Sequence, residues 1–171
     1  MDERERDAAA QVEGVDRFNA AGVDAALAEV QACNASRRWA RELVAGRPYP
    51  DLAAVEAASE KILQTLSWDD VREALDAHPR IGERAAGSGR EASWSRQEQA
   101  GAAGGDFVAA NREYEDRFGH VFLISAAGRS PDEILDNLHS RLSNDAETEL
   151  CVAAEEHRRI TRLRLAQLLA G

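Results

Sequence analysis

The sequence predicts an all-α protein: a single compact domain of several helices with one buried extended segment. The 171 residues are rich in alanine, leucine and arginine and contain only four prolines and 5% aromatic residues, a composition that favours helix over sheet. Apolar residues recur at helical spacing through most of the chain. Only residues 121–127 have the apolar, glycine-bounded character of a strand, and no second run could pair with them.

In the first half of the chain, capping residues mark the predicted helices. Residues 1–13 are predicted to be a frayed polar N-terminus, and 14–171 to form the domain. A helical face covers residues 25–33. Ser36 and Asp51 are predicted N-caps of the next two helices, because short polar side chains accept hydrogen bonds from the free N–H groups of a first turn.

A short helix is predicted over residues 71–77, and it ends at a His-Pro pair. Pro79 disfavours helical geometry in the residue before it, so His78 is placed at the end of one element and the start of the next. Gly82 and the glycine-rich residues 87–89 allow the backbone to turn closely around a ligand.

In the second half, a helix is predicted from Ser95 to about Phe118, with Ser95 and Glu98 forming a capping box. Ser130 starts another helix, because a capping serine precedes a proline at the first helical position. Asn144, with Glu147, is predicted to cap the last helix, which runs to about Leu169. Without a sheet, the backbone groups of residues 121–127 must bond to side chains, water or a ligand.

Charge and cysteine content limit the possible functions. The net charge is −10, and basic runs are short, which argues against nucleic acid or anionic membrane as the main partner. Cys33 and Cys151 are too few and too far apart for a disulfide framework or a zinc site, and no two histidines have short ligand spacing. No apolar run or leader-like start suggests membrane insertion or secretion, so a cytoplasmic setting is expected.

The last helix carries one arginine on its apolar face. At about 100° per residue, Arg164 falls with Ile160 and Leu168, whereas Arg162 falls away from them. An inward arginine must pair with a carboxylate or contact a bound anion. The helix alone supports both explanations equally. Taken alone, His78 and Glu98 are more simply explained as helix caps than as catalytic residues.

Several short pieces of the sequence, taken in order, match a known family. They span about residues 15 to 169: Phe18-Asn19, Ser36-x-x-Trp39, Arg47-Pro48-Tyr49, His78-Pro79-x-Ile81-Gly82, Ser95-x-x-Glu98-Gln99, Tyr114 with Phe118-Gly119 and Phe122-x-Ile124, Ser130-x-x-Glu133-Ile134-Leu135, Arg141-Leu142-x-Asn144, and Glu149-Leu150 with Ala153, Glu156, Ile160 and Leu163-Arg164-Leu165. On these residues the chain resembles 2-oxo-4-hydroxy-4-carboxy-5-ureidoimidazoline (OHCU) decarboxylases, which act in the conversion of urate to (S)-allantoin. One departure is Ser125-Ala126, where the family commonly has Cys-Ala.

The resemblance implies an all-helical carboxy-lyase that needs no cofactor and no metal and is often a homodimer. Its small-molecule substrate would come from uricase and hydroxyisourate hydrolase. His78 would be the catalytic, stereospecifically protonating histidine, with Glu98 as its carboxylate partner and Arg164 as the active-site arginine. The implied substrate-binding residues are Pro79, Ser95, Arg96, Gln97, Glu98, Gln99, Leu123, Ile124, Ser125 and Ala126.

Two alternatives to this interpretation remain open. One is a different small helical lyase or hydrolase that uses a His-Glu pair. The other is a non-catalytic helical interaction module, which predicts no pocket joining His78, Glu98 and Arg164. The other histidines, His120, His139 and His157, are predicted to be ordinary loop, surface or core residues.

Overall fold

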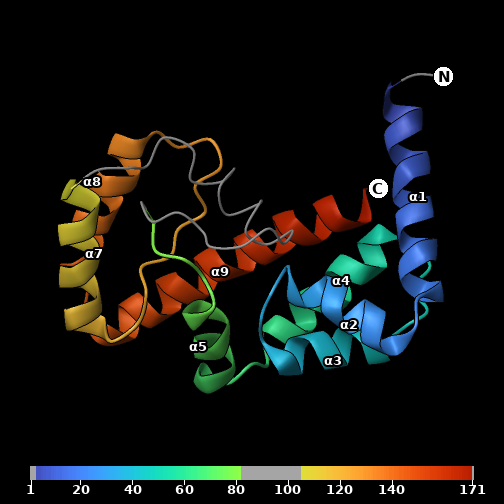
Figure 1. Ribbon diagram of the computed structural model, residues 1–171, viewed down its shortest axis with the longest axis horizontal. Helices are drawn as coiled ribbons and strands as arrows, with labels where there is room; N and C mark the ends of the chain where they lie inside the picture. The colour runs from blue at the N-terminus through green and yellow to red at the C-terminus, as the bar shows by residue number, and fades with distance from the viewer. Residues whose placement is uncertain (1–2, 82–104, 171) are drawn as a thin grey trace. The chain divides into compact units, whose positions relative to one another are not determined.

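The computed structural model describes residues 3–81 and 105–170, and the only regular elements in these ranges are helices, as predicted (Figure 1). The helices are α1 (Glu3–Ala20), α2 (Val23–Gln31), α3 (Arg37–Ala45), α4 (Leu52–Leu63), α5 (Trp68–Asp76), α7 (Gly105–Phe118), α8 (Pro131–Arg141) and α9 (Ala146–Leu169). They form two compact units. The first contains the described residues up to Val71 and from Thr161 onward, and the second is Arg72–Ile160.

In the first unit, the predicted caps of α3 and α4 are confirmed. The Ser36 hydroxyl accepts a hydrogen bond from the Trp39 N–H at 3.3 Å, and the Asp51 carboxylate accepts one from the Ala54 N–H at 2.8 Å. Trp39 is fully buried, as expected of a core anchor, and its indole N–H donates to the Ser59 hydroxyl at 3.0 Å. The polar end of this large side chain is therefore satisfied inside the core.

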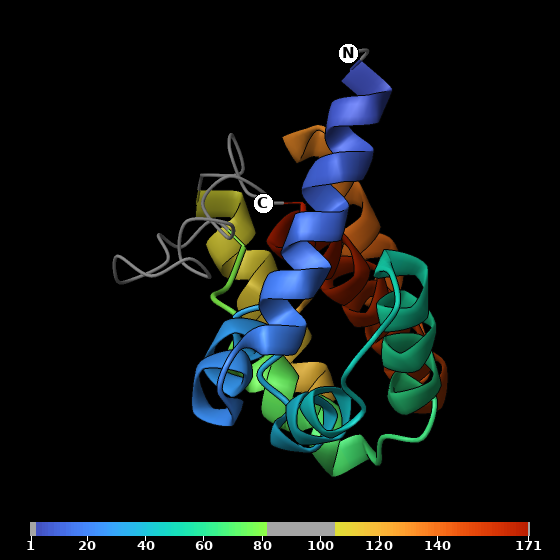
Figure 2. The ribbon, with the colours of Figure 1, turned by 90° about the vertical axis from the view of Figure 1, so that its right-hand side faces the viewer.

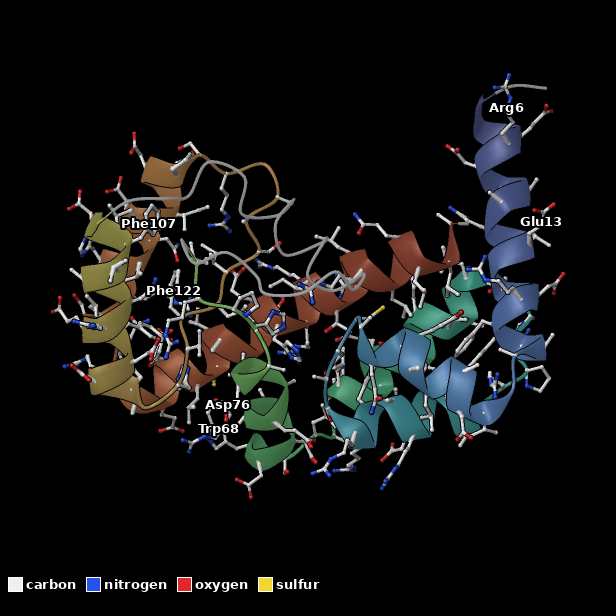
Figure 3. The ribbon with its side chains drawn as sticks, in the orientation of Figure 1. Arg6, Glu13, Trp68, Asp76, Phe107 and Phe122 are labelled. Atoms are coloured by element: carbon white, nitrogen blue, oxygen red, sulfur yellow. The ribbon has the colours of Figure 1, made fainter. Side chains whose placement is uncertain are left out.

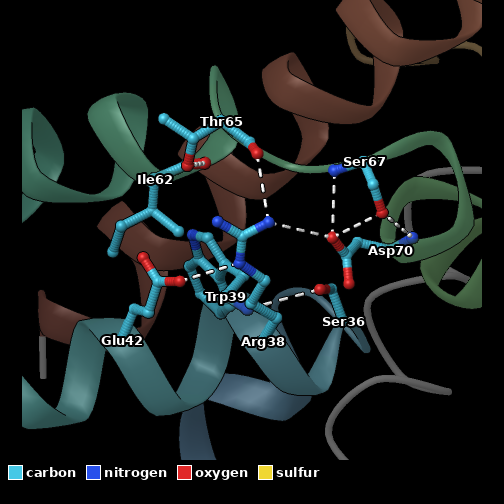
Figure 4. A network of polar contacts seen from close by, with 8 residues as sticks. All are labelled: Ser36, Arg38, Trp39, Glu42, Ile62, Thr65, Ser67 and Asp70. Carbon is cyan, nitrogen blue, oxygen red and sulfur yellow. Dashed lines mark hydrogen bonds and ion pairs between the residues drawn. The ribbon is translucent and has the colours of Figure 1, made fainter.

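Arg38 links α3 to the chain between α4 and α5 (Figure 4). Its guanidinium donates to Glu42 at 2.8 Å, to the Thr65 carbonyl at 3.1 Å and to Asp70 at 3.3 Å. Asp70 also accepts from the hydroxyl and N–H of Ser67, and the Ser67 hydroxyl accepts from the Asp70 N–H. This reciprocal pair caps α5, so the helix begins at Trp68 rather than at the predicted residue 71.

The N-terminal helix starts earlier than the sequence suggested. α1 begins at Glu3, in the region expected to be frayed. Residues 5–9 are exposed, which explains why their polar sequence gave no core signal, but the alanines among them have high helix propensity. The buried anchors are Val15 and Phe18, as predicted.

The end of α1 is held by Arg47, and its middle packs against the end of α9 (Figure 2). Arg47 donates to the carbonyls of Phe18 and Ala21 at 2.6 and 2.8 Å, groups that a helix end leaves without partners. At the other contact, a Cβ atom on Gly14 would lie only 2.0 Å from the Leu169 carbonyl oxygen. A residue without a side chain is therefore required where α1 crosses α9.

In the second unit, α7 and α8 enclose an aromatic core (Figure 3, in which Phe107 and Phe122 are labelled). The buried members of this core are Ile81, Phe107, Ala110, Tyr114, Phe122, Ile124, Ala126, Ile134 and Leu138. The predicted Ser130 cap of α8 is present, and it is part of a capping box in which Ser130 and Glu133 each accept a hydrogen bond from the other's backbone N–H. α7 ends at Phe118 as predicted, whereas the proposed Ser95 cap lies outside the described residues.

The prediction for the cap of α9 is wrong by one residue. Asp145, not Asn144, accepts from the Thr148 N–H at 2.8 Å and from the Thr148 hydroxyl at 2.9 Å. Asn144 instead donates its side-chain amide to the buried Glu149 at 2.8 Å. Because the Asn144 side chain is engaged with Glu149, Asp145 caps the helix.

Residues 121–127, called the extended segment below, are irregular and mostly buried, as predicted, and only Ala127 among them is exposed. Phe122, Leu123 and Ile124 are each at most 4% exposed. The Leu123 carbonyl accepts from Arg141 at 2.7 Å, and the Ser125 N–H donates to Glu156 at 2.8 Å. Side chains of α8 and α9 therefore supply hydrogen bonds that a neighbouring strand would otherwise provide.

His120, which precedes the extended segment, makes stability sensitive to pH. It is 4% exposed, and burial lowers its pKa below the ordinary value of 6.5. Because the unfolded chain then binds more protons than the folded one, the free energy of unfolding should fall as the pH drops below about 6.5. We expect this fall to be shallower in His120→Phe, measured by urea denaturation over a series of pH values. Equal slopes for the two proteins would contradict the assignment.

Residues 3–81 and 105–170 contain neither a membrane-spanning helix nor a cluster of potential metal ligands. None of the helices there is long and apolar enough to cross a membrane. The same ranges contain no group of three or more His, Cys, Asp or Glu side chains that could hold a metal ion.

Candidate active site

His78 lies where the sequence places it, just after the end of α5. The N–H groups of Ala77 and His78 bond back to Ala74 and Leu75 at 3.3 and 3.0 Å, tightening the last turn before Pro79. The His78 side chain is buried with 8% exposed, and Pro79 is partly exposed. A buried imidazole at an irregular helix end is a suitable proton donor or acceptor near neutral pH.

The ring of His78 meets a second histidine, His157 of α9. The two ring centroids are 5.7 Å apart and the ring planes are at 88°, an edge-to-face arrangement. His157 is 1% exposed. The sequence predicted an ordinary residue at this position; helical periodicity placed it on the buried face, but no local pattern could show that it meets His78.

Next to His157, Glu156 contacts the extended segment. Its Oε2 accepts from the Ser125 N–H at 2.8 Å, while its Oε1 accepts from Arg159 at 3.1 Å and lies 4.0 Å from a guanidinium nitrogen of Arg129. These arginines compensate the charge of a carboxylate that is largely buried. Two consecutive residues of α9 thus bind the extended segment and His78.

Behind the extended segment lies a buried ion pair between Arg141 and Glu149. Arg141 donates to Glu149 through Nε at 2.8 Å and Nη2 at 2.5 Å, and to the Leu123 carbonyl at 2.7 Å. The Tyr114 hydroxyl donates to Glu149. Burial, reinforced by this hydrogen bond, raises the pKa of Tyr114 well above its ordinary value, so the hydroxyl keeps its proton. Sequence pattern alone gave none of these residues a role.

Arg164 is turned inward, as the helical-face analysis predicted. It is 1% exposed, and its Nη1 lies 3.5 Å from the Ala32 carbonyl. Arg162 is exposed and pairs with Glu60 at 3.2 Å, so it is the outward arginine. Arg164 and Ala32 both belong to the first unit, whereas His78 belongs to the second.

The remaining predicted site residues fall into two groups. Leu123, Ile124 and Ala126 are buried in the extended segment, and Ser125 is partly exposed. The others lie outside the described residues: Ser95, Arg96, Gln97, Glu98 and Gln99.

A hollow of about 360 Å³ lies next to the chain that follows Pro79. Its lining residues are Arg80, Ile81, Val108, Asn111, Arg112 and Glu115. Arg80 forms a two-point ion pair with Glu115 at 2.5 and 2.9 Å, and Asn111 donates to the Ile81 carbonyl at 2.7 Å. These contacts fix the chain immediately after the His-Pro pair.

Comparisons with known proteins identify the fold and the family. A solved structure described as OHCU decarboxylase in the presence of (S)-allantoin superimposes with a TM-score of 0.72 at 28% identity, covering 84% of this chain and 98% of that one. The OHCU decarboxylase of Amia calva is 31% identical, over 72% of this chain and 75% of its own length. The uric acid degradation bifunctional protein TTL of Arabidopsis thaliana is 31% identical over 151 residues, and the chain spans only 47% of that protein.

The all-helical fold and these relatives together place the chain among small helical proteins related to OHCU decarboxylases. A model of the OHCU decarboxylase family matches residues 19–166, which is most of the chain. The chain belongs to the OHCU decarboxylase family. The matched range includes residues of both compact units.

Proposed function

We propose that the protein decarboxylates 2-oxo-4-hydroxy-4-carboxy-5-ureidoimidazoline to (S)-allantoin. The observation that carries this proposal is the likeness, at 28% identity and over almost the full length of that chain, to a decarboxylase crystallised with (S)-allantoin. The buried His78 after α5 and the inward Arg164 support it, because the resemblance implies these two residues as catalytic.

The proposed chemistry needs no cofactor. Cleavage of the carbon–carbon bond at ring carbon 4 releases carbon dioxide, and the electron pair left there delocalises into the double bond between carbon 5 and its ring nitrogen. His78 then donates one proton to one face of carbon 5, which carries the ureido group, while the proton of the 4-hydroxyl moves to the ring nitrogen and the 4-oxygen becomes the carbonyl of allantoin. General acid catalysis of such a proton transfer is worth about 10²–10⁴-fold. Arg164 and backbone N–H groups would stabilise the developing negative charge. Glu98 would orient His78 or bind the substrate hydroxyl.

The extended segment would hold the polar groups of the substrate together with Pro79 and residues 95–99. Arg141 and Glu156 support this role, because they bond the Leu123 carbonyl and the Ser125 N–H and so hold the other backbone groups of the segment in place before substrate arrives. Preorganised polar groups of this kind need little rearrangement during the reaction. Binding through the backbone also accounts for Ser125 at the position where the family commonly has cysteine.

We also propose the setting in which the enzyme works. It acts as a cytoplasmic homodimer and takes its unstable substrate from uricase and hydroxyisourate hydrolase. The family resemblance supports this setting. Sedimentation of the purified chain measures the assembly directly, and a monomer at working concentration would overturn the dimer.

The proposed reaction is tested by following allantoin formation from urate with circular dichroism. Uricase and hydroxyisourate hydrolase generate the substrate in the cuvette, with and without this protein. We expect a fast rise of the (S)-allantoin signal when the protein is present. Racemic allantoin formed at the uncatalysed rate, in the presence of folded protein, would overturn the proposal.

A further inference from the structure

Helix α9 presents two adjacent side chains to different parts of the candidate active site. Glu156 bonds the Ser125 N–H, and His157 packs against the ring of His78. All four residues belong to the second unit, so one rigid helix ties the extended segment to the histidine. Glu156 and His157 thereby couple the positions of two pieces that are far apart in the sequence.

The geometry of the two histidines favours one orientation of the His78 ring. At 88° and 5.7 Å, the electropositive edge of one ring faces the electron-rich surface of the other, the arrangement that aromatic rings prefer. Both side chains are buried, so water does not compete for the same faces. The backbone at His78 has left the helix, and the contact with His157 restrains its ring.

We propose that His157 is a positioning residue for His78, holding its imidazole in the orientation that delivers a proton to one face of the substrate carbon. This inference rests on the proposed function. In this role His157 acts through His78 and not on the substrate. A general acid that donates to one face must be held in place, because a ring free to rotate delivers its proton less often and less selectively.

The distinguishing variants are His157→Leu, which removes the aromatic ring, and His157→Phe, which restores one without the ring nitrogens. Because an aromatic pair contributes a modest free energy, His157→Leu should lower kcat about three- to tenfold and leave KM unchanged. The allantoin that it forms should also have a lower enantiomeric purity. His157→Phe should return kcat to within about twofold of the native value. A matched control is His120→Leu, the same substitution at another buried histidine of this unit, which should leave kcat unchanged.

A second measurement reads the contact without activity. In protein labelled with ¹³C and ¹⁵N histidine, the His78 ring signal, assigned by its loss in His78→Ala, should move in His157→Leu and stay near its native position in His157→Phe. A native kcat and an unmoved His78 signal in His157→Leu would overturn the inference, as would a His157→Phe variant as impaired as His157→Leu. An inactive native protein would overturn the proposed function, and the His78 signal would still decide whether His157 orients the ring.

Discussion

Replacing His78 with alanine should abolish the enzyme-catalysed formation of (S)-allantoin and leave the fold intact. The substitution removes the only group that the proposed mechanism assigns to proton delivery, so the rate of stereospecific protonation should fall by about 10²–10⁴-fold. Residual allantoin should then be racemic. The measurement is the circular dichroism assay with coupled uricase and hydroxyisourate hydrolase, at equal concentrations of folded protein.

The control for this prediction is His139→Ala. His139 lies exposed on α8 and should tolerate the change without loss of activity. Far-ultraviolet circular dichroism and thermal melting establish that the His78→Ala protein is folded. Near-native turnover by His78→Ala would show that another group supplies the proton. A melted His78→Ala protein would show that the histidine is structural, closing a helix end rather than catalysing a reaction.

Local sequence rules predicted those parts of the fold that depend on near neighbours. The caps Ser36, Asp51 and Ser130 are all present, because a capping hydrogen bond spans only three residues. The rule failed at Asn144, whose side chain bonds the buried carboxylate of Glu149 at a separation of 5 residues and leaves the cap to Asp145. The early start of α1 was missed because a polar, exposed helix carries no apolar periodicity.

In the candidate site, too, local sequence rules predicted some features and missed the contacts that depend on packing. The boundary at His78 follows from one proline, and the burial of Arg164 follows from helical periodicity. The contacts of His157 with His78 and of Glu156 with Ser125 depend on how α9 packs, which no local pattern encodes. The family resemblance nevertheless pointed to some of these residues, because its matching pieces include Glu156. They also include the members of one buried network: Tyr114, Arg141, Asn144 and Glu149.

That network carries the largest expected effect on stability. Glu149 is fully buried and accepts hydrogen bonds from Arg141, Tyr114 and Asn144. In Arg141→Met the carboxylate would lose its only ion-pair partner among the described residues, and the Leu123 carbonyl would lose its donor. Removing one member of a buried pair leaves an uncompensated charge, so the free energy of unfolding should fall by about 3–5 kcal/mol. Urea denaturation measures this directly.

Two further variants show whether the loss of stability in Arg141→Met comes from the unpaired charge of Glu149 or from the loss of the arginine side chain itself. The double variant Arg141→Met with Glu149→Leu removes both charges and should be more stable than Arg141→Met alone, because no buried carboxylate remains unpaired. Arg162→Met breaks an exposed pair with Glu60 and should change stability far less. If Arg141→Met unfolded at nearly the same urea concentration as the native protein, the ion pair between Arg141 and Glu149 would not stabilise the core. Any folded Arg141→Met protein should also be a slower enzyme, since the same guanidinium fixes the extended segment through Leu123.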